Sequence, residues 1–256
     1  MKNIDLSVIV PSINPQFWLN IYNGLIKSVG EEYVFELICV GPNFPQESLS
    51  KVSNFKYISS FACPSVAFME GFVLARGRKI CFCPDDIILD EGGLGKCLDL
   101  LKDKPENHGV TLRYDEGGQS QSSNENYWRG SFHNDQKLPG INPEWKIAPC
   151  FMYDRVYFHE SGGLNTDMEH VNVNGHSLAF YTQHNGGVLH PSPTRVFQAG
   201  WSAPTESTIL YRAYLENDAP KFKSFWERPD AVKDYFVDLW DFKRKPHIWP
   251  RRYKTA

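Results

Sequence analysis

The chain has 256 residues, with 27 Lys and Arg against 30 Asp and Glu, so its formal net charge is −3. This balance argues against general nucleic-acid binding, which needs a surplus of cations to displace counterions. Hydrophobic residues make up 41% of the chain and charged residues 22%, which excludes disorder as the dominant state. The length fits one large α/β domain or two small ones.

The sequence also indicates a compartment. No run approaches the roughly 20 apolar residues that a membrane span needs, and the first residues lead into an apolar strand without room for a signal peptide. The six cysteines stand mostly in apolar runs and lack the paired spacing of a zinc site. We therefore expect a cytoplasmic protein with buried, reduced cysteines.

Apolar periodicity predicts alternating strands and helices in the first half of the chain. Short apolar runs that end at Pro or Gly predict strands, and apolar residues at helical spacing predict helices. The expected strands cover residues 6–11, 34–40, 55–60, 79–83 and 110–114, and the expected helices cover residues 17–29, 67–75 and 94–101. This alternation implies a mostly parallel sheet with right-handed crossovers.

The alternation breaks at residues 115–142, which are rich in Gly, Ser, Asn and Gln. A loop of this length is typical of a lid, a binding loop or a disordered insert. Order returns over residues 147–158, before a Gly162-Gly163 turn. Later helices are expected at residues 175–184, 210–215 and 231–240, and strands around Val188 and Val196. Because no linker or internal repeat is found, we expect a single domain.

The acidic pair in Pro84-Asp85-Asp86 is the sharpest chemical feature of the sequence. It follows an expected central strand, and ligands of open parallel sheets sit beyond the carboxyl ends of the strands. Adjacent carboxylates repel each other unless a cation or hydrogen bonds compensate. Mg²⁺ and Mn²⁺ take few carboxylates and complete their shells with phosphate oxygens. A solvated turn explains the dipeptide as well, so both interpretations remain open at this point.

Four segments together resemble family 2 glycosyltransferases with the GT-A fold. They are the opening strand at residues 6–12, a helix with an Ala-x-Gly turn at 71–77, a strand with its acidic motif at 79–92, and a stretch at 150–163 that ends in Gly-Gly. Their order and spacing agree with that family over most of residues 4–200. The resemblance implies a GT-A fold, a Rossmann-like α/β class with a mostly parallel central sheet flanked by helices.

The resemblance also implies a domain plan and an activity. Residues 1–204 would form the GT-A domain, with a nucleotide-sugar half at about 1–115 and an acceptor half at about 143–204. Residues 205–256 would form a helical C-terminal appendage with a basic aromatic tail. The implied reaction moves a sugar from a nucleotide-diphosphate donor to a hydroxyl acceptor, as in polysaccharide or other glycan assembly. The alternatives are a catalytically degenerate domain that binds nucleotide sugar, or a nucleotidyltransferase, whose Gly-rich basic phosphate loop is not found here.

Carried over position by position, the resemblance assigns the donor site. Pro11 and Ser12 would line the nucleotide pocket. Asp86 would hold a Mn²⁺ or Mg²⁺ ion on the donor diphosphate, and Asp85 would contact the ribose or the metal. Such a cation stabilises the negative charge that builds on the leaving diphosphate.

Three departures from the family pattern affect the remaining assignments. The turn at residues 40–43 lacks the aspartate that usually bonds the base, so the nucleotide stays open. The histidine that often completes the metal shell falls near Gln198, and His190 is the nearest candidate in sequence. Residues 174–176 read Asn-Gly-His where inverting members usually carry Glu-Asp, whose aspartate deprotonates the acceptor.

His176, Glu169 and Asp167 are therefore the candidate bases. His176 stands at the start of an expected helix and titrates in a useful pH range. The alternatives are a helix-end histidine bonded to backbone or water, and two carboxylates of a solvated loop. The basic tail with Trp249 and Tyr253 has two interpretations as well, a solvated terminus or a peripheral contact with an anionic membrane surface.

Overall fold

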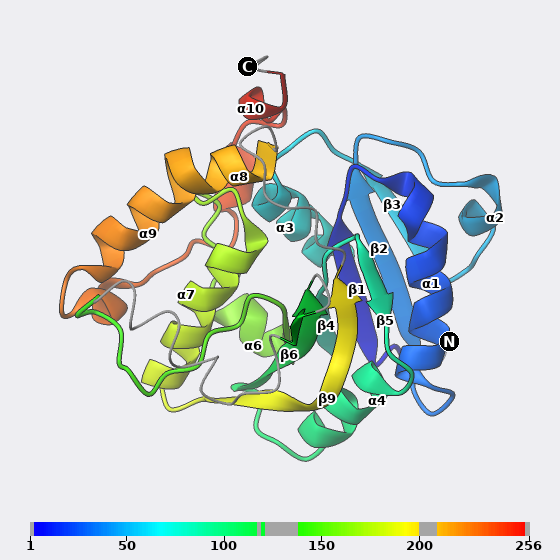
Figure 1. Cartoon of the computed structure of the whole chain (residues 1–256), viewed down its shortest axis with the longest axis horizontal. Coiled ribbons are helices and arrows are strands. Elements are labelled where there is room, and N and C mark those ends of the chain that lie inside the picture. Colours follow the sequence, from blue (N-terminus) through cyan, green and yellow to red (C-terminus); the bar gives the residue numbers. More distant parts are fainter. Residues whose placement is uncertain (1–2, 117–118, 121–137, 200–208, 254–256) are drawn as a thin grey trace.

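The computed structural model describes residues 3–116, 119–120, 138–199 and 209–253. Within these residues, nine strands form one sheet in the order β3-β2-β1-β4-β8-β6-β9-β5, and β7 pairs with β6 outside this path. Helices flank the sheet on both sides, with α1 and α4 packed together on one side and α3 and α7 on the other (Figure 1). The expected α/β class is confirmed.

The first half of the chain builds the parallel part of the sheet. Its strands are β1 (Leu6–Pro11), β2 (Phe35–Gly41), β3 (Phe55–Ser59) and β4 (Lys79–Phe82), and its helices are α1 (Pro15–Val29), α2 (Glu47–Ser50) and α3 (Pro64–Leu74). β1 pairs in parallel with both β2 and β4, and β2 pairs in parallel with β3. Because β1 and β2 are buried along almost their whole length, their sequences are mostly apolar, with Ser7 and Glu36 as the polar exceptions, which made them easy to predict.

The second half adds strands of both directions. It contains β5 (Ile87–Leu89), α4 (Gly93–Leu101), β6 (His108–Glu116), β7 (Gln119–Ser120), β8 (Phe151–Asp154), α6 (Arg155–Glu160), α7 (Val171–His184) and β9 (Val188–Ala199). β8 is antiparallel to both β4 and β6, whereas β6 and β9 are parallel. β5 is antiparallel to β9 at the edge of the sheet.

Two strands expected around Val188 and Val196 are one strand, β9. Pro191 and Pro193 lie inside it and suggested a break, because proline cannot donate a ladder hydrogen bond. The β6–β9 ladder absorbs them through register shifts on either side of Arg113. Most of the loop expected at residues 115–142 lies outside the described residues, so its interpretation as a lid stays a prediction.

The C-terminal part is helical but irregular. It contains α8 (Ile209–Ala213), η1 (Tyr214–Asp218), α9 (Ala219–Trp226), η2 (Ala231–Asp234), η3 (Asp241–Arg244) and α10 (Pro250–Tyr253). The helix expected over residues 231–240 is wrong beyond η2. Tyr235 and Val237 are buried and Phe236 between them is 83% exposed, so the burial alternates with the period of extended chain.

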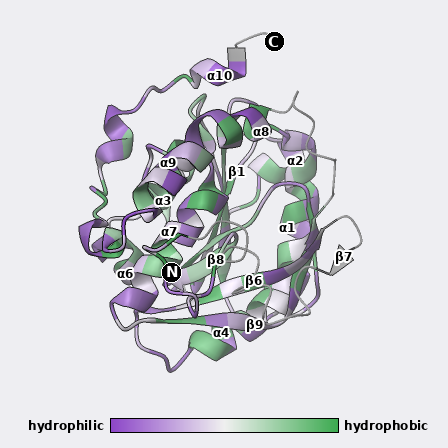
Figure 2. Ribbon diagram, turned by 60° about the vertical axis from the view of Figure 1, so that its left-hand side comes forward, coloured by the Kyte–Doolittle hydropathy of each residue, from purple (hydrophilic) through white to green (hydrophobic). Residues whose placement is uncertain are grey.

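Two hydrophobic clusters hold these elements together. The larger one surrounds the sheet and includes the buried face of α1, whose buried Trp18, Ile21 and Leu25 recur at helical spacing. Figure 2 shows both hydrophobic and hydrophilic residues on this helix. The smaller cluster joins α7 to α9 and η2. All six cysteines are buried and none forms a disulfide bond, as expected. In the described part of the chain, no helix combines the length and the apolar character that a membrane crossing requires.

Candidate functional site

A cavity of about 370 Å³ opens where the first three strands of the sheet end. Pro11 lies at the end of β1 and Ser12 follows it, Val40 and Gly41 lie at the end of β2, and Ser60 follows β3. Ligands of parallel sheets sit beyond these carboxyl ends, because the loops there diverge and leave a crevice. Pro11 and Ser12 therefore line a cavity at the position expected for a nucleotide pocket.

The floor of the cavity depends on a glycine. A Cβ atom at Gly41 would lie 1.8 Å from the backbone oxygen of Ser12, so no side chain fits there. The backbone N–H of Ser12 donates to the oxygen of Val40 at 2.9 Å. This close approach keeps the ends of β1 and β2 together and makes the backbone itself the base of the cavity.

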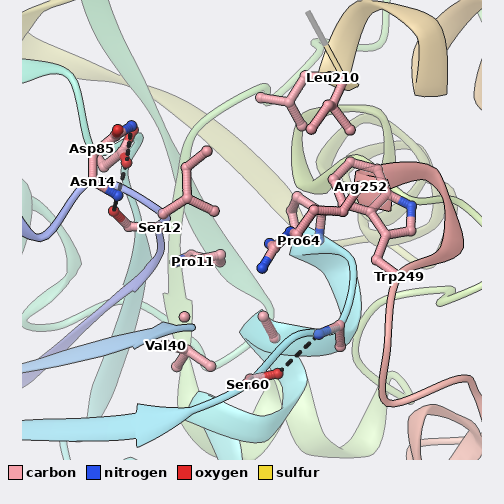
Figure 3. A pocket seen from close by; sticks show the side chains of 15 residues that line it. Pro11, Ser12, Asn14, Val40, Ser60, Pro64, Asp85, Leu210, Trp249 and Arg252 are labelled. Carbon is pink, nitrogen blue, oxygen red and sulfur yellow. Dashed lines mark hydrogen bonds between the residues drawn. The ribbon is translucent and has the colours of Figure 1, made fainter. Parts of the chain in front are cut away.

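Asp85 is fixed at one wall by a hydrogen-bond network (Figure 3). Its Oδ2 accepts hydrogen bonds from Ser12 Oγ at 2.5 Å and from Asn14 Nδ2 at 3.0 Å. Ser12 Oγ accepts in turn from the indole N–H of the fully buried Trp18 at 2.7 Å. Burial raises the pKa of Asp85, while the hydrogen bonds from Ser12 and Asn14 oppose that shift. The network thus holds the carboxylate in one orientation toward the cavity.

Asp86 has no such support. Its side chain is exposed on one side, and it forms no ion pair with any residue that the structure describes. The protein atoms that displace water around it and the charge of Asp85 both raise its pKa. Asp85 lines the cavity and Asp86 follows it directly in the chain. Two carboxylates without a compensating cation form a local excess of negative charge.

Asp85 and Asp86 are the carboxylates that could hold a metal ion beside the cavity. Among the described residues, no three His, Cys, Asp or Glu side chains converge on a common point. Mg²⁺ and Mn²⁺ nevertheless bind through one or two carboxylates when substrate phosphates complete the shell. Asp85 and Asp86 fit that mode, in which the cation arrives with a nucleotide, and they do not fit a resident site made of protein ligands alone.

The expected metal role of His190 does not agree with the sheet register. His190 lies opposite Val110 near the start of β9, where its Nε2 is 3.0 Å from Nδ1 of His108. Gln198, near the end of β9, lies opposite Ile88, which follows Asp86 closely in the chain. Eight residues of extended chain span roughly 25 Å, so His190 and Asp86 do not reach the same ion. The part of β9 that lies close to Asp86 is its end, at Gln198 and Ala199.

The opposite wall of the cavity comes from the end of the described chain. Trp249 and Arg252 line it together with Pro64 at the start of α3 and Leu210 in α8 (Figure 3). Sequence reasoning missed this wall. Trp249 is only 6% exposed, although it stands in a polar, basic stretch. A large aromatic side chain inside such a stretch was the one signal that the tail packs on the protein.

His176 is placed differently from the expectation. The helix α7 begins at Val171, not near residue 175, so His176 lies in its second turn and is buried. The helix is buried on most of its surface, which removed the periodicity that marks a helix start. Burial lowers the pKa of His176 to about 3. A base with this pKa is weak at neutral pH, and His176 does not line the cavity.

Glu169 and Asp167 both carry cationic partners. Glu169 Oε2 accepts hydrogen bonds from Trp249 Nε1 at 2.9 Å and from Arg251 Nε at 2.8 Å, and its side chain is 19% exposed. Asp167 pairs with Lys245, but its side chain remains 59% exposed. Asp167 therefore keeps a carboxylate that an acceptor can reach, whereas Glu169 is occupied by the chain's own tail.

Two residues of the basic aromatic tail turn toward the protein. Trp249 is buried, and Arg251 is bound by Glu169 and by Glu216. Trp249 and Arg251 therefore attach the tail to the rest of the protein. The side chain of Tyr253 lies outside the described residues.

Neither protein-family models nor curated protein sequences give a match to this chain. Solved structures do. The crystal structure of S. aureus TarS 1-349 superposes with a TM-score of 0.55 at 13% identity, over 77% of this chain and 60% of that one. The longer S. aureus TarS structure gives a TM-score of 0.54 at 14% identity, over 84% of this chain and 40% of that one.

A third structure, S. aureus TarS 1-349 in complex with UDP-GlcNAc, gives a TM-score of 0.55 at 14% identity, over 89% of this chain and 71% of that one. TarS is a family 2 glycosyltransferase of the GT-A fold. At such low identity the match shows the fold alone, and the chain spans less than two thirds of the first two TarS structures. The expected GT-A fold is thereby confirmed.

Proposed function

We propose, on the GT-A fold that this chain shares with TarS, that the protein transfers a sugar from a nucleotide-diphosphate donor to a hydroxyl acceptor. The observation that carries the proposal is a carboxylate pair without a cationic partner among the described residues: Asp85 lines the cavity at the strand ends, and Asp86 follows it directly in the chain. A solvated surface turn does not need a carboxylate locked by Ser12 and Asn14. A donor site does.

The donor side of the mechanism follows from these residues. The nucleoside would lie between the ends of β1 and β2, against Pro11 and Val40. Asp86, with Asp85 beside it, would hold Mn²⁺ or Mg²⁺ together with the donor diphosphate. When bound, this cation supplies charge stabilisation for the leaving diphosphate. The network around Ser12 keeps Asp85 oriented, so that no reorganisation is needed when the donor arrives.

We assign the base to Asp167. Its carboxylate is the most exposed of the three candidates, and it also lines a second cavity of about 310 Å³. The walls of this cavity include the accessible rings of Phe225 and Phe236, and flat aromatic faces of this kind suit the faces of sugar rings. The segment that carries Asp167 continues to Glu169, which contacts Trp249 at the main cavity. The second cavity is therefore our candidate for the acceptor glycan.

One observation favours a degenerate nucleotide-sugar-binding domain as the second candidate. Asn174 and Gly175 occupy the place where inverting relatives usually carry Glu-Asp, and Asn174 is used inside the protein. Its Nδ2 donates to Ser65 Oγ at 2.8 Å and to the oxygen of His170 at 3.0 Å. The degenerate domain would bind the donor, but it would transfer the sugar neither to an acceptor nor to water.

The setting we propose is glycan assembly in the cytoplasm, because all six cysteines are buried in the fold as thiols without a disulfide bond. The test of the function is a thermal-shift panel of nucleotide sugars with and without Mn²⁺. UDP-GlcNAc comes first, because it is the ligand named for the TarS complex. A ligand at a hundredfold excess over its Kd stabilises the native state by about 2.7 kcal/mol.

We expect at least one donor to raise the melting temperature in a Mn²⁺-dependent way. If no nucleotide sugar raises the melting temperature in the presence of Mn²⁺, the proposal is wrong. A transfer assay with radiolabelled donor and a mixture of glycan acceptors then distinguishes the two candidate functions. An active enzyme transfers the label, and a degenerate domain does not.

A further inference from the structure

An exposed aromatic side chain, Phe236, lines the second cavity. It lies in the extended segment that begins at Tyr235, directly after η2. Tyr235 and Val237 on either side of it are buried. Because neighbouring side chains of extended chain point to opposite sides, burial of Tyr235 and Val237 directs the ring of Phe236 outward, where it lines the cavity.

The Gly162-Gly163 turn holds this segment in place. Gly162 has a φ of +86°, which lies in the left-handed region that favours glycine. A Cβ atom at Gly162 would lie 2.0 Å from the backbone oxygen of Val237, so the segment packs directly on the backbone of the turn. The side chain of Leu239 packs in the same way beside Gly163. The turn, which the donor site does not use, therefore fixes where Phe236 stands.

Phe236 differs from the aromatic side chains beside it. The rings of Trp226 and Tyr235 stack on each other at 6.1 Å, and Phe225 packs edge-on against both. The guanidinium of Arg228 lies 4.9 Å from the centre of the Phe225 ring. Phe236 makes no ring contact with any residue that the structure describes. A single exposed apolar side chain is ordinary on a surface, but at a cavity it offers a ligand an unoccupied aromatic face.

Asn165 and Asp167 bring polar groups to the same cavity. Asn165 Oδ1 accepts the backbone N–H of Asp167 at 3.0 Å, and no described residue accepts a hydrogen bond from its Nδ2. The two amide N–H groups are therefore available to a ligand. Lys221 Nζ donates to the backbone oxygen of Asp167 at 2.8 Å, which holds this short segment against α9. The cavity thus combines amide donors, a carboxylate acceptor and an aromatic ring.

A pyranose ring with equatorial hydroxyl groups matches this combination. Its axial C–H bonds form two apolar faces, and its hydroxyl groups form a polar edge that both donates and accepts hydrogen bonds. The apolar face suits an aromatic ring, and the polar edge suits amide and carboxylate groups. An acyclic polyol carries similar hydroxyl groups but has no fixed apolar face.

We propose that Phe236 and Asn165 bind a pyranose of the acceptor glycan, with an apolar face of the sugar on the ring of Phe236. The acceptor class is then a glycan rich in equatorial hydroxyl groups, such as chains of β-linked glucose or N-acetylglucosamine. This inference rests on the proposed function, because it names the acceptor for the second cavity. The Gly162-Gly163 turn contributes to acceptor binding by positioning the segment that carries Phe236.

The test measures saccharide binding directly. Cellobiose and chitobiose are titrated into the full chain and followed by saturation-transfer difference NMR, alone and with UDP and Mn²⁺. Sorbitol is the probe with hydroxyl groups and no ring. We expect at least one disaccharide to bind wild type more tightly than sorbitol does. Phe236→Ala should weaken that disaccharide about 3- to 10-fold, as the loss of a stacking partner implies, and should leave sorbitol unchanged.

Three further variants complete the test. Phe44→Ala is the matched control, since Phe44 is 81% exposed and lines neither cavity, and it should leave disaccharide affinity unchanged. Phe236→Trp keeps an aromatic face and should bind the disaccharide at least as well as wild type. Asn165→Asp keeps an oxygen for the N–H of Asp167 but loses the amide donors, so disaccharide binding should weaken. Melting temperatures show that each variant is folded.

Three results would overturn the assignment. Equal disaccharide affinity in wild type and Phe236→Ala removes the role of the ring. Sorbitol binding as tight as that of the disaccharides means that hydroxyl groups alone are recognised. If wild type binds neither disaccharide while a nucleotide sugar raises the melting temperature, this inference fails and the proposed function stands. If a disaccharide binds through Phe236 but no nucleotide sugar binds, the saccharide site stands and the proposed function fails.

Discussion

The carboxylates on the two sides of the main cavity are held in opposite ways. On one side, Asp85 is held by neutral donors and Asp86 has no cationic partner among the described residues. On the other side, Glu169 is clamped by Arg251 and Trp249. In the first arrangement, burial raises the pKa values of both carboxylates, and the hydrogen bonds to Asp85 oppose that shift without a cation to help them. The second uses the carboxylate to fasten the chain's own C-terminal segment.

This difference distinguishes carboxylates that are available to a ligand from carboxylates that stabilise the fold. An acidic residue that the protein compensates internally contributes to stability. An acidic pair left uncompensated lowers stability, and its presence is explained by a partner that is not part of the chain. Asp85 and Asp86 belong to the second kind, and Glu169 to the first. Asp167 lies between them, paired with Lys245 yet largely exposed.

The largest expected effect concerns Asp167. If it is the base, Asp167→Asn should lower kcat about 10²- to 10⁴-fold, while donor affinity stays the same. His176→Gln should change kcat far less, because His176 is buried away from the cavity. Single-turnover transfer assays with the donor found in the thermal-shift panel measure both. A fully active Asp167→Asn variant would move the base elsewhere.

The next effect concerns Asp86. Asp86→Asn removes the uncompensated charge, so Mn²⁺-dependent nucleotide binding should weaken by at least about a hundredfold. At neutral pH the ligand-free variant should melt at the same temperature as wild type or higher, since a like-charge contact with Asp85 is lost. Glu91→Gln, a nearby exposed carboxylate, is the control. A destabilised variant with normal metal-dependent binding would show that Asp86 serves the fold.

A smaller effect is expected at the opposite wall. Glu169→Gln breaks the ion pair with Arg251 between side chains that are 19% and 15% exposed. Urea denaturation should show a loss of about 1–3 kcal/mol in the free energy of unfolding. Glu47→Gln breaks an exposed helix pair with Lys51 and should cost less than about 0.5 kcal/mol. Equal losses in the two variants would mean that the clamp contributes no more than a surface pair.

The smallest effect at neutral pH concerns His176. Its pKa is lowered to about 3 in the folded protein, below the value of the unfolded chain. The unfolded state therefore takes up a proton first as the pH falls, and stability is lost from about pH 6.5 downward. The stability advantage of wild type over His176→Gln should shrink between pH 7 and pH 4 in denaturation series. A constant difference across this range would show that His176 is not buried in its neutral form.

Much of the donor side was predictable because its signals are local. The strands β1, β2 and β4 are mostly apolar runs, and the acidic pair stands shortly after β4. The parallel topology then brings the ends of β1 and β2 and the Asp85 turn to one edge of the sheet. The position of Pro11, Ser12 and Asp85 around one cavity followed from this reasoning.

The sequence by itself thus determined the GT-A half of the fold and the carboxylate wall, since each depends on residues close in the chain or on the rules of parallel sheets. Only the tertiary structure decided that Arg252 and Trp249 form the facing wall, that Glu169 anchors them, and that His176 lies inside α7. These outcomes depend on packing between segments far apart in the chain. Apolar periodicity shows which face of a helix or strand packs on the core, but it does not show which distant segment of the chain packs against that face.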